Sequence, residues 1–279
     1  MKSLIINFTP TGIIPRKEHT PYIPISPEEI IEQVHQAYEL GITVVHLHAR
    51  EANGDASYKA TIYRPILEGL RKHCPKLVLG VSLSGRNFSE FEKRSEVLAL
   101  QPDMGSLTLG SLNFMKQASL NAPDMIQRLL EKMDDYGVNP ELECFDMGMI
   151  NYAKYLISKQ MIHPPYYFNL LVGNIATAQA DLLQIGLMIK ELPNASYWAL
   201  GGIGSFQQVA NSIAIACGGG VRIGLEDNIW QDAEKTQLAS NHSLLERIHQ
   251  LAAIAERPIQ SPESFGKAGF YNKKVHTNN

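Results

Sequence analysis

The sequence predicts a single closed (β/α)8 barrel, or TIM barrel, of the α/β class. Eight short runs rich in β-branched and apolar residues alternate with longer segments of helical periodicity, as repeated βαβ units do. Most of these runs are continuously apolar, which is typical of parallel strands covered on both faces. The 279 residues are also close to the roughly 250 at which such a barrel closes. An open doubly wound sheet has fewer strands and would leave much of the chain unassigned.

The expected strands recur along the whole chain, with helix signals between them. The clearest helix start is at Ser26, where a capping serine and Pro27 precede two acidic residues and an apolar stripe. Less distinct starts lie at residues 122–124 and 205–208, and Gly41 and Gly137 are expected to end two helices. The strands are expected at residues 4–9, 43–48, 77–83, 104–109, 141–145, 167–171, 196–199 and 220–223.

Residues 1–279 are expected to form one domain, because no low-complexity linker interrupts the pattern. Residues 260–279 read as a C-terminal tail, which we expect to cover the barrel or a neighbouring subunit. A chain of this length buries enough surface to fold without a disulfide or a structural metal. Any bound metal is therefore expected to be catalytic.

The composition favours small-molecule chemistry in the cytoplasm. A formal net charge of -3 gives no basic field for nucleic acid, and no apolar segment approaches the ~20 residues that cross a membrane. The apolar stretch at the N-terminus is too short for a signal peptide. Cys74, Cys144 and Cys217 share no CxxC spacing, which indicates reduced thiols in a reducing compartment.

Two histidines, His46 and His48, end the second expected strand. A spacing of two places both side chains on the same face of a strand, and in a barrel that face points to the lumen. Two imidazoles near the mouth of the barrel are well placed to share a zinc ion. On this motif alone, a hydrogen-bonded pair of core histidines remains the alternative.

A cluster of charges, Arg222, Glu226 and Asp227, follows the eighth expected strand. Barrel active sites are built at the carboxyl ends of the strands, so charges at this position suggest function. Glu226 can complete a set of two histidines and one carboxylate, which leaves a coordination position open, as catalytic zinc sites do. A solvated charged loop is the alternative for this segment.

Polar side chains and glycines also follow the third, fourth and fifth strands. Ser82, Gly85 and Ser106 lie in loops whose hydroxyls and exposed amides could hold a carboxylate. Ordinary turn chemistry is the alternative, because serine and glycine are common in such loops. Glu143 shares a strand face with Glu141 and is expected to point into the lumen.

Taken together, these segments resemble the β-keto acid cleavage enzymes. The resemblance extends from the first strand to about residue 255, and an HxHxR motif joined to a distant VRxGxEDN motif is specific to it. It rests on the turn at residues 17–19, the HLHAR strand, the Ser82 and Ser106 loops, the segment PELECFDMGMI and the segment VRIGLEDN.

The resemblance implies an activity and a role for each site residue. Enzymes of this family transfer an acyl unit between a β-keto acid and acetyl-CoA, giving acetoacetate and a new CoA thioester, and a homodimer or homotetramer is expected. The implied roles are zinc binding by His46, His48 and Glu226, proton abstraction by Asp227, charge support by Arg222, and binding of the substrate carboxylate or carbonyl by Ser82 and Ser106.

Two positions depart from the family members that act on an amino-substituted keto acid. Ile14 stands where those members have a glutamate suited to an ammonium group. Burying an ammonium beside isoleucine without a partner is unfavourable, so a neutral or apolar β-keto acid is expected. Ser106 replaces a threonine and keeps its hydroxyl, so the chemistry is expected to be retained with a slightly altered shape.

Two other classes of function remain open. Zinc-dependent hydrolases of the amidohydrolase type also carry HxH on a barrel strand, but on the first strand and with further histidines at later strand ends. Here the motif is on the second strand, and no histidine ends a later one. A non-catalytic barrel that only binds a small ligand would tolerate loss of the metal ligands and of Asp227, all of which are present.

Overall fold

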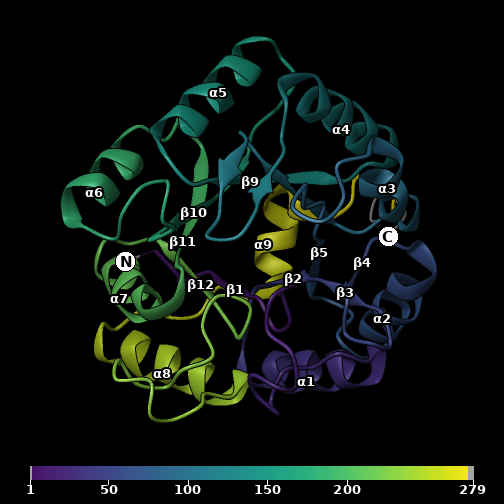
Figure 1. The fold of residues 1–279 in the computed structure, drawn as a ribbon. Coiled ribbons are helices and arrows are strands. Elements are labelled where there is room, and N and C mark those ends of the chain that lie inside the picture. The colour runs from purple at the N-terminus through teal and green to yellow at the C-terminus, as the bar shows by residue number, and fades with distance from the viewer. Residues whose placement is uncertain (1, 276–279) are drawn as a thin grey trace.

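A computed structural model describes residues 2–275 and contains the expected closed barrel. Every neighbouring pair of barrel strands is parallel, and the order β1-β12-β11-β10-β9-β6-β5-β2 closes on itself where β1 pairs with β2. Figure 1 looks along the barrel and shows the helices as a ring around the strands. The barrel strands are β1 (Ile6–Phe8), β2 (Val44–Leu47), β5 (Val78–Val81), β6 (Met104–Thr108), β9 (Asn139–Cys144), β10 (Tyr166–Val172), β11 (Ser196–Gly202) and β12 (Gly220–Ile223).

The helices lie between the strands as the alternation predicts, with one shortened unit. After β5, the five-residue helix α3 (Phe91–Ser95) continues into a 3-10 helix at Glu96–Leu100 instead of forming one long helix. The other barrel helices are α1 (Pro27–Leu40), α2 (Ala60–His73), α4 (Pro123–Tyr136), α5 (Met147–Ser158), α6 (Leu182–Lys190), α7 (Gln207–Ala216) and α8 (Asn241–Ile254).

Local sequence signals explain the ends of these helices. The Ser26 side chain accepts a hydrogen bond from the backbone of Glu29, whose carboxylate accepts one from the backbone of Ser26 in return. Gly41 and Gly137 end α1 and α4 with φ of 105° and 71°, a left-handed conformation that suits glycine. The predicted helix starts and stops at these positions are confirmed.

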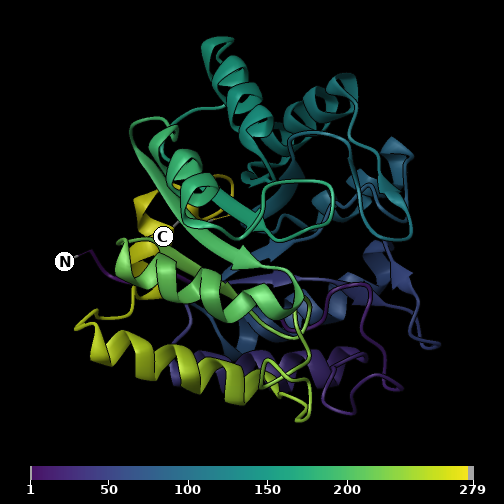
Figure 2. The ribbon, with the colours of Figure 1, turned by 60° about the vertical axis from the view of Figure 1, so that its left-hand side comes forward.

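Two short hairpins stand at the carboxyl ends of the barrel strands, where the site lies. One pairs β3 (Ala49–Arg50) with β4 (Ala56–Ser57), and the other pairs β7 (Leu112–Asn113) with β8 (Ala118–Ser119). Figure 2 shows the hairpins at one end of the barrel and the yellow C-terminal segment at the other. The sequence did not predict the hairpins, because two-residue strands carry no periodic signal.

The C-terminal segment closes the amino-terminal end of the barrel. It comprises α9 (Pro262–Phe265) and a π-helical turn at Gly266–Phe270, and α9 lies at the centre of the ring in Figure 1. The rings of Phe265 and Phe270 stack with centroids 4.3 Å apart and pack in one cluster with residues of five strands, β2, β5, β6, β10 and β11, and with Ile5, which directly precedes β1. The described part of the tail therefore covers the barrel, one of the two placements expected from the sequence.

This packing gives a stability prediction. Phe265→Ala is expected to lower the free energy of unfolding by about 3–5 kcal/mol, because it removes a fully buried aromatic ring and leaves a cavity below the lumen. Denaturant unfolding followed by circular dichroism measures this change. Ile254→Ala, on an exposed side chain at the end of α8, should stay within about 0.5 kcal/mol of the parent. Equal effects of the two changes on the free energy of unfolding would contradict the conclusion that Phe265 stabilises the closed end of the barrel.

Two further features bear on the sequence expectations. The thiols of Cys74, Cys144 and Cys217 are all free, as expected from their spacing. None of the helices in residues 2–275 is long and apolar enough to cross a membrane.

Candidate metal and active site

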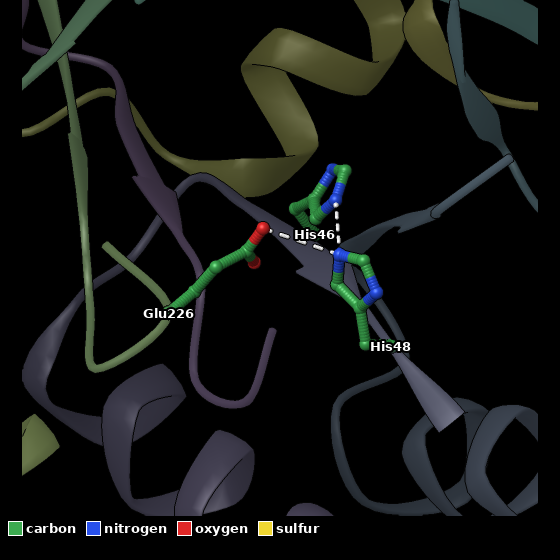
Figure 3. A group of neighbouring side chains, drawn as sticks. All are labelled: His46, His48 and Glu226. Atoms are coloured by element: carbon green, nitrogen blue, oxygen red, sulfur yellow. Dashed lines mark hydrogen bonds and ion pairs between the residues drawn. The ribbon is translucent and has the colours of Figure 1, made fainter. Parts of the chain in front are cut away.

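The two histidines of the HLHAR segment point at each other at the mouth of the barrel. His46 lies within β2 and His48 directly follows it, and both side chains are buried. Their Nε2 atoms are 3.1 Å apart, as Figure 3 shows. Two ring nitrogens at this distance either share one proton or face a common ligand.

Glu226 reaches the same point from the far end of the chain. It follows β12, which is separated from β2 in the barrel only by β1. Its Oε1 atom lies 3.2 Å from Nε2 of His48 (Figure 3), and one donor atom from each of the three side chains lies within 4.8 Å of the others. Its other oxygen, Oε2, is buried and has no hydrogen-bond partner in residues 2–275.

The loop after β1 covers Glu226 closely. Gly12 has φ of 61°, and a Cβ atom at this position would lie 2.5 Å from Cγ of Glu226. A glycine is therefore required here both for its backbone conformation and for the close approach. The sequence did not predict this role of Gly12, because it depends on a contact with a residue from the far end of the chain.

Glu141 fixes the orientation of His46. Its Oε2 atom lies 2.7 Å from Nδ1 of His46, and its Oε1 atom accepts hydrogen bonds from the amides of Asn7 and Asn169 at 2.6 and 2.9 Å. The carboxylate thereby accepts the Nδ1 proton of His46 and orients Nε2 toward His48 and Glu226. The sequence placed Glu141 on the lumen face but gave it no role, and it did not single out Asn7 or Asn169.

The buried ionisable groups of the site shift one another's pKa values. Burial lowers the pKa of His46, but the negative charges of Glu141 and Glu226 outweigh it and raise the pKa to about 9. Burial lowers the pKa of His48. For Glu226, burial acts to raise the pKa, but Arg222 and the two histidines hold it far below its usual range. Glu226 is therefore an anion that faces imidazole nitrogens.

Arg222 binds three carboxylates from its position inside β12. Its Nη2 donates to Oε1 of Glu226 at 2.7 Å and its Nε donates to Oδ2 of Asp227 at 2.8 Å. A carboxylate oxygen of Glu143 lies 3.7 Å from Nη1. With the guanidinium buried, these contacts fix the two acidic side chains after β12 relative to each other.

Asp227 and Glu143 are both held more basic than ordinary carboxylates. Burial and the neighbouring charge of Glu226 raise the pKa of Asp227, although Arg222 opposes them. Burial also raises the pKa of Glu143, which accepts a hydrogen bond from Oγ1 of Thr108 at 2.7 Å. A carboxylate with a raised pKa is a better proton acceptor from carbon.

A small cavity opens beside His48. It lies between the β3–β4 hairpin and the loop after β5. Among residues 2–275, its lining includes no carboxylate. Its lining includes Ile13, Tyr58, Ser82, Ser84 and Phe88.

The other three residues expected at the site, which are Ser82, Ser106 and Gly85, lie in different surroundings. Ser82 lines the cavity together with His48. Ser106 is buried, and its hydroxyl accepts a hydrogen bond from the backbone of Leu83 at 3.1 Å, so it supports the loop that carries Ser82. Gly85 allows a close backbone approach, because a Cβ atom there would lie 2.2 Å from the carbonyl oxygen of Leu120.

Ile14 does not line this cavity. Its side chain is 52% exposed, whereas its neighbour Ile13 faces the cavity. The structure therefore does not place Ile14, the residue expected at the substrate, in the wall of this cavity, where Ile13 lies instead. An offset of one residue cannot be resolved from a loop sequence, because a loop has no fixed side-chain period.

The fold and the position of the ionisable side chains indicate the class of protein to which the chain belongs. A closed barrel whose ionisable side chains gather at the carboxyl ends of its strands is the architecture of barrel enzymes. A family model described as beta-keto acid cleavage enzyme matches residues 3–267. The chain belongs to the β-keto acid cleavage enzyme family.

Individual relatives agree with this assignment. The chain is 34% identical to the 3-keto-5-aminohexanoate cleavage enzyme of Fusobacterium nucleatum, over 94% of this chain and 96% of that protein. It is 33% identical to the 3-oxoadipate:acetyl-CoA acetyltransferase of Cupriavidus necator, over 91% and 90%. The structure of apo ObcA superposes with a TM-score of 0.79 at 19% identity, a likeness of fold. That match covers 90% of this chain and 66% of the ObcA chain.

Proposed function

We propose that this protein is a zinc-dependent enzyme that converts a β-keto acid and acetyl-CoA into acetoacetate and a new acyl-CoA. The observation that carries the proposal is the convergence of His46, His48 and Glu226 on one point, with Asp227 held beside them by Arg222. The names of the curated relatives, which cleave or transfer units of β-keto acids, support the reaction class.

The donor atoms suit zinc. Two imidazole nitrogens and one carboxylate oxygen form a set that leaves a fourth position open for substrate, as in catalytic zinc sites. The orphaned Oε2 of Glu226 and the orientation of His46 by Glu141 are further signs of a cation-binding centre, where a bound cation would take the place of the Nε2 proton. A second group, His46 with Glu141 and Glu143, fits less well, because both oxygens of Glu141 already accept hydrogen bonds.

Asp227 is the proposed base for the carbon acid. When bound, zinc supplies Lewis-acid stabilisation of negative charge on the keto oxygen. The raised pKa of Asp227 makes it a stronger acceptor for the proton of the carbon between ketone and carboxylate. Arg222 keeps the carboxylate in place and offsets part of the negative charge that the site gathers.

The proposed reaction conserves every atom of its two substrates. The C2–H bond of the keto acid breaks, and C2 bonds to the acetyl carbon as the CoA thiolate leaves. The thiolate then bonds to C3, the C2–C3 bond breaks, and C2 regains a proton. Acetoacetate therefore contains C1 and C2 of the keto acid together with the acetyl group, and the new thioester contains C3 and the chain beyond it.

The cavity beside His48 is the proposed place for the acyl chain of the keto acid. It contains no carboxylate, and Ile13 and the Tyr58–Phe88 ring pair form apolar walls. An ammonium group on the chain would be desolvated there without a partner, which is costly. We therefore propose a keto acid whose chain beyond the ketone carries no positive charge.

A panel of β-keto acids with acetyl-CoA tests this function. Formation of acetoacetate and of a new acyl-CoA in equal amounts is the expected result, with amino-substituted keto acids the poorest substrates. Acetoacetate production that requires no added keto acid, or hydrolysis of the keto acid without acetyl-CoA, would reject the proposal. The second outcome would favour the hydrolase alternative.

The contact between Glu141 and His46 gives a prediction for metal affinity. Glu141→Gln should weaken zinc binding about 10- to 100-fold, because the amide no longer fixes the proton of His46 on Nδ1 as strongly. Competition with a zinc-responsive chelator measures the dissociation constant. Glu39→Gln, in an exposed pair with His35, is the matched control and should leave it unchanged. Equal affinities for all three proteins would contradict the orienting role of Glu141.

The family resemblance also leads us to propose a homodimer or homotetramer that acts in the cytoplasm. Size-exclusion chromatography with light scattering tests the assembly, and a monomer at micromolar concentration would contradict it.

A further inference from the structure

Arg50, the last residue of the HLHAR segment, is a buried cation with no role in the proposed chemistry. It lies in β3, two residues after His48, and its side chain is buried. Two of its nitrogen atoms, Nε and Nη1, are buried and have no hydrogen-bond partner in residues 2–275. A desolvated charge with unpartnered donors is costly to the folded state. Its presence at the mouth of the barrel therefore points to a function other than stability.

The third nitrogen of Arg50 makes a hydrogen bond to a different element of the fold. Its Nη2 donates to the carbonyl oxygen of Pro15, in the loop after β1. The next residue, Arg16, makes a second connection at the surface, where it donates to the carbonyl of Asn53 at 3.3 Å and pairs with Asp55. Both of these partners lie in the turn between β3 and β4. The loop after β1 is therefore tied to the β3–β4 hairpin, and Arg50 supplies the buried part of the connection.

The two elements that Arg50 connects both line the cavity beside His48. The loop contributes Ile13, and the hairpin contributes Ala56 and Ser57. Within the hairpin, Arg50 is paired directly with Ala56. The backbone of Arg50 thus belongs to one wall of the cavity, while its side chain holds the loop that carries another.

The same loop also packs on Glu226. Gly12 approaches this side chain so closely that a Cβ atom would not fit between them. The start of the loop is fixed independently of Arg50, because Asn241 donates to the carbonyl of Pro10 at 3.0 Å. Arg50 is the buried anchor at the other end. Loss of the Arg50 contact is therefore expected to release the segment that packs on Glu226 and lines the cavity.

We propose that Arg50 is a positioning residue that holds the loop after β1 against the β3–β4 hairpin, so that Ile13 stays in the wall that limits the length of the acyl chain. The inference rests on the proposed function, because it takes the cavity beside His48 as the place of that chain. Arg50 is not among the described residues that line the cavity, so it acts through the loop and not by contact with substrate. One methylene group in an apolar pocket changes discrimination about 10-fold or more, so a wall that moves should admit longer chains.

Tryptic cleavage of the metal-free protein tests the contact without any turnover. Arg50→Met keeps a long side chain and removes the donors. Cleavage after Arg16 and Lys17, which directly follow Pro15, should become about 10- to 100-fold faster, as loss of one hydrogen bond from a charged donor allows. Mass spectrometry of the fragments identifies the sites. Arg50→Lys should restore part of the protection, because it returns a charge and a donor without the planar fork.

Arg257→Met is the matched control, because Arg257 is also a buried arginine that donates to backbone carbonyls. Its partners include Lys2 at 3.1 Å and Gly219 at 2.7 Å, at the amino-terminal end of the barrel. This change should lower the melting temperature and leave cleavage after Arg16 and Lys17 unchanged well below that temperature. Equal acceleration in both variants would show that cleavage follows global unfolding, and would overturn the positioning role.

Selectivity between two keto acids of different length tests the effect on substrate. In the zinc-loaded wild-type protein, kcat/KM should be higher for 3-oxopentanoate than for 3-oxooctanoate. The ratio of the two values should fall about 10-fold or more in Arg50→Met and stay unchanged in Arg257→Met. A loss of folded protein alone lowers both values equally and does not change their ratio.

The outcomes separate this inference from the proposed function. Active Arg50→Met protein with an unchanged ratio, or with unchanged cleavage of the loop, would overturn the inference and leave the proposed function intact. Wild-type protein that turns over no keto acid in the panel would reject the proposed function together with the role in selectivity. The rate of tryptic cleavage would then still decide whether Arg50 holds the loop.

Discussion

Asp227→Asn is expected to keep its zinc and its fold and to lose about 100- to 10,000-fold in kcat, the range that general base catalysis contributes. Asparagine preserves the size of the side chain and can still accept a hydrogen bond from Arg222, so the arrangement around Glu226 should persist. It cannot accept a proton from carbon. The loss should therefore fall on the chemical step and not on metal binding.

Loss of deuterium from the C2 position of a labelled β-keto acid isolates this step from the rest of the cycle. The wild-type protein should accelerate exchange of that deuterium with water, and Asp227→Asn should not. Asp134→Asn, an exposed aspartate near the end of α4, is the control and should behave as wild type. A variant at residue 227 that exchanges C2 deuterium at the wild-type rate would assign the base to another group, with Glu143 the next candidate.

His46→Ala and Glu226→Ala are each expected to abolish zinc binding and activity together. Each change removes one of the three proposed protein donors, and the two that remain would not suffice to hold a catalytic zinc ion tightly. Elemental analysis of purified protein should give about one zinc per wild-type chain and almost none for either variant. His35→Ala, which removes an exposed histidine of α1, should keep the wild-type content.

Stability must be measured beside metal content in these variants. Glu226→Ala leaves Arg222 buried with one carboxylate fewer, so some destabilisation is expected apart from metal loss. Glu226→Gln retains an acceptor for Arg222 and separates the two effects. A wild-type protein that contains no metal yet is folded and fully active would contradict the zinc site.

The barrel could be predicted from sequence because its strands are buried on both faces and read as continuous apolar runs. Residues 104–109 and 220–223 are examples, and β6 and β12 lie at these positions. The closure by Phe265 and Phe270 could not be predicted in the same way. Those side chains pack with residues of five different strands and with Ile5 just before β1, and no local pattern encodes such a contact.

The candidate site could also be predicted only in part from the sequence. The sequence predicted that His46, His48 and Glu226 would converge, because an HxH motif and a charged strand end both occur where barrel strands finish. It did not predict the hydrogen bonds of Glu141 with His46, Asn7 and Asn169. These partners come from three other strands, so their meeting depends on the register of the closed barrel.

The fate of labelled carbon tests the proposed reaction most directly. A β-keto acid labelled with carbon-13 at C1 and C2 is incubated with unlabelled acetyl-CoA, and the products are separated and read by mass spectrometry. The proposed reaction places both labels in acetoacetate and none in the new acyl-CoA. Label in the thioester, as transfer of CoA to the intact keto acid would give, or label in free acetate, as hydrolysis would give, would contradict it.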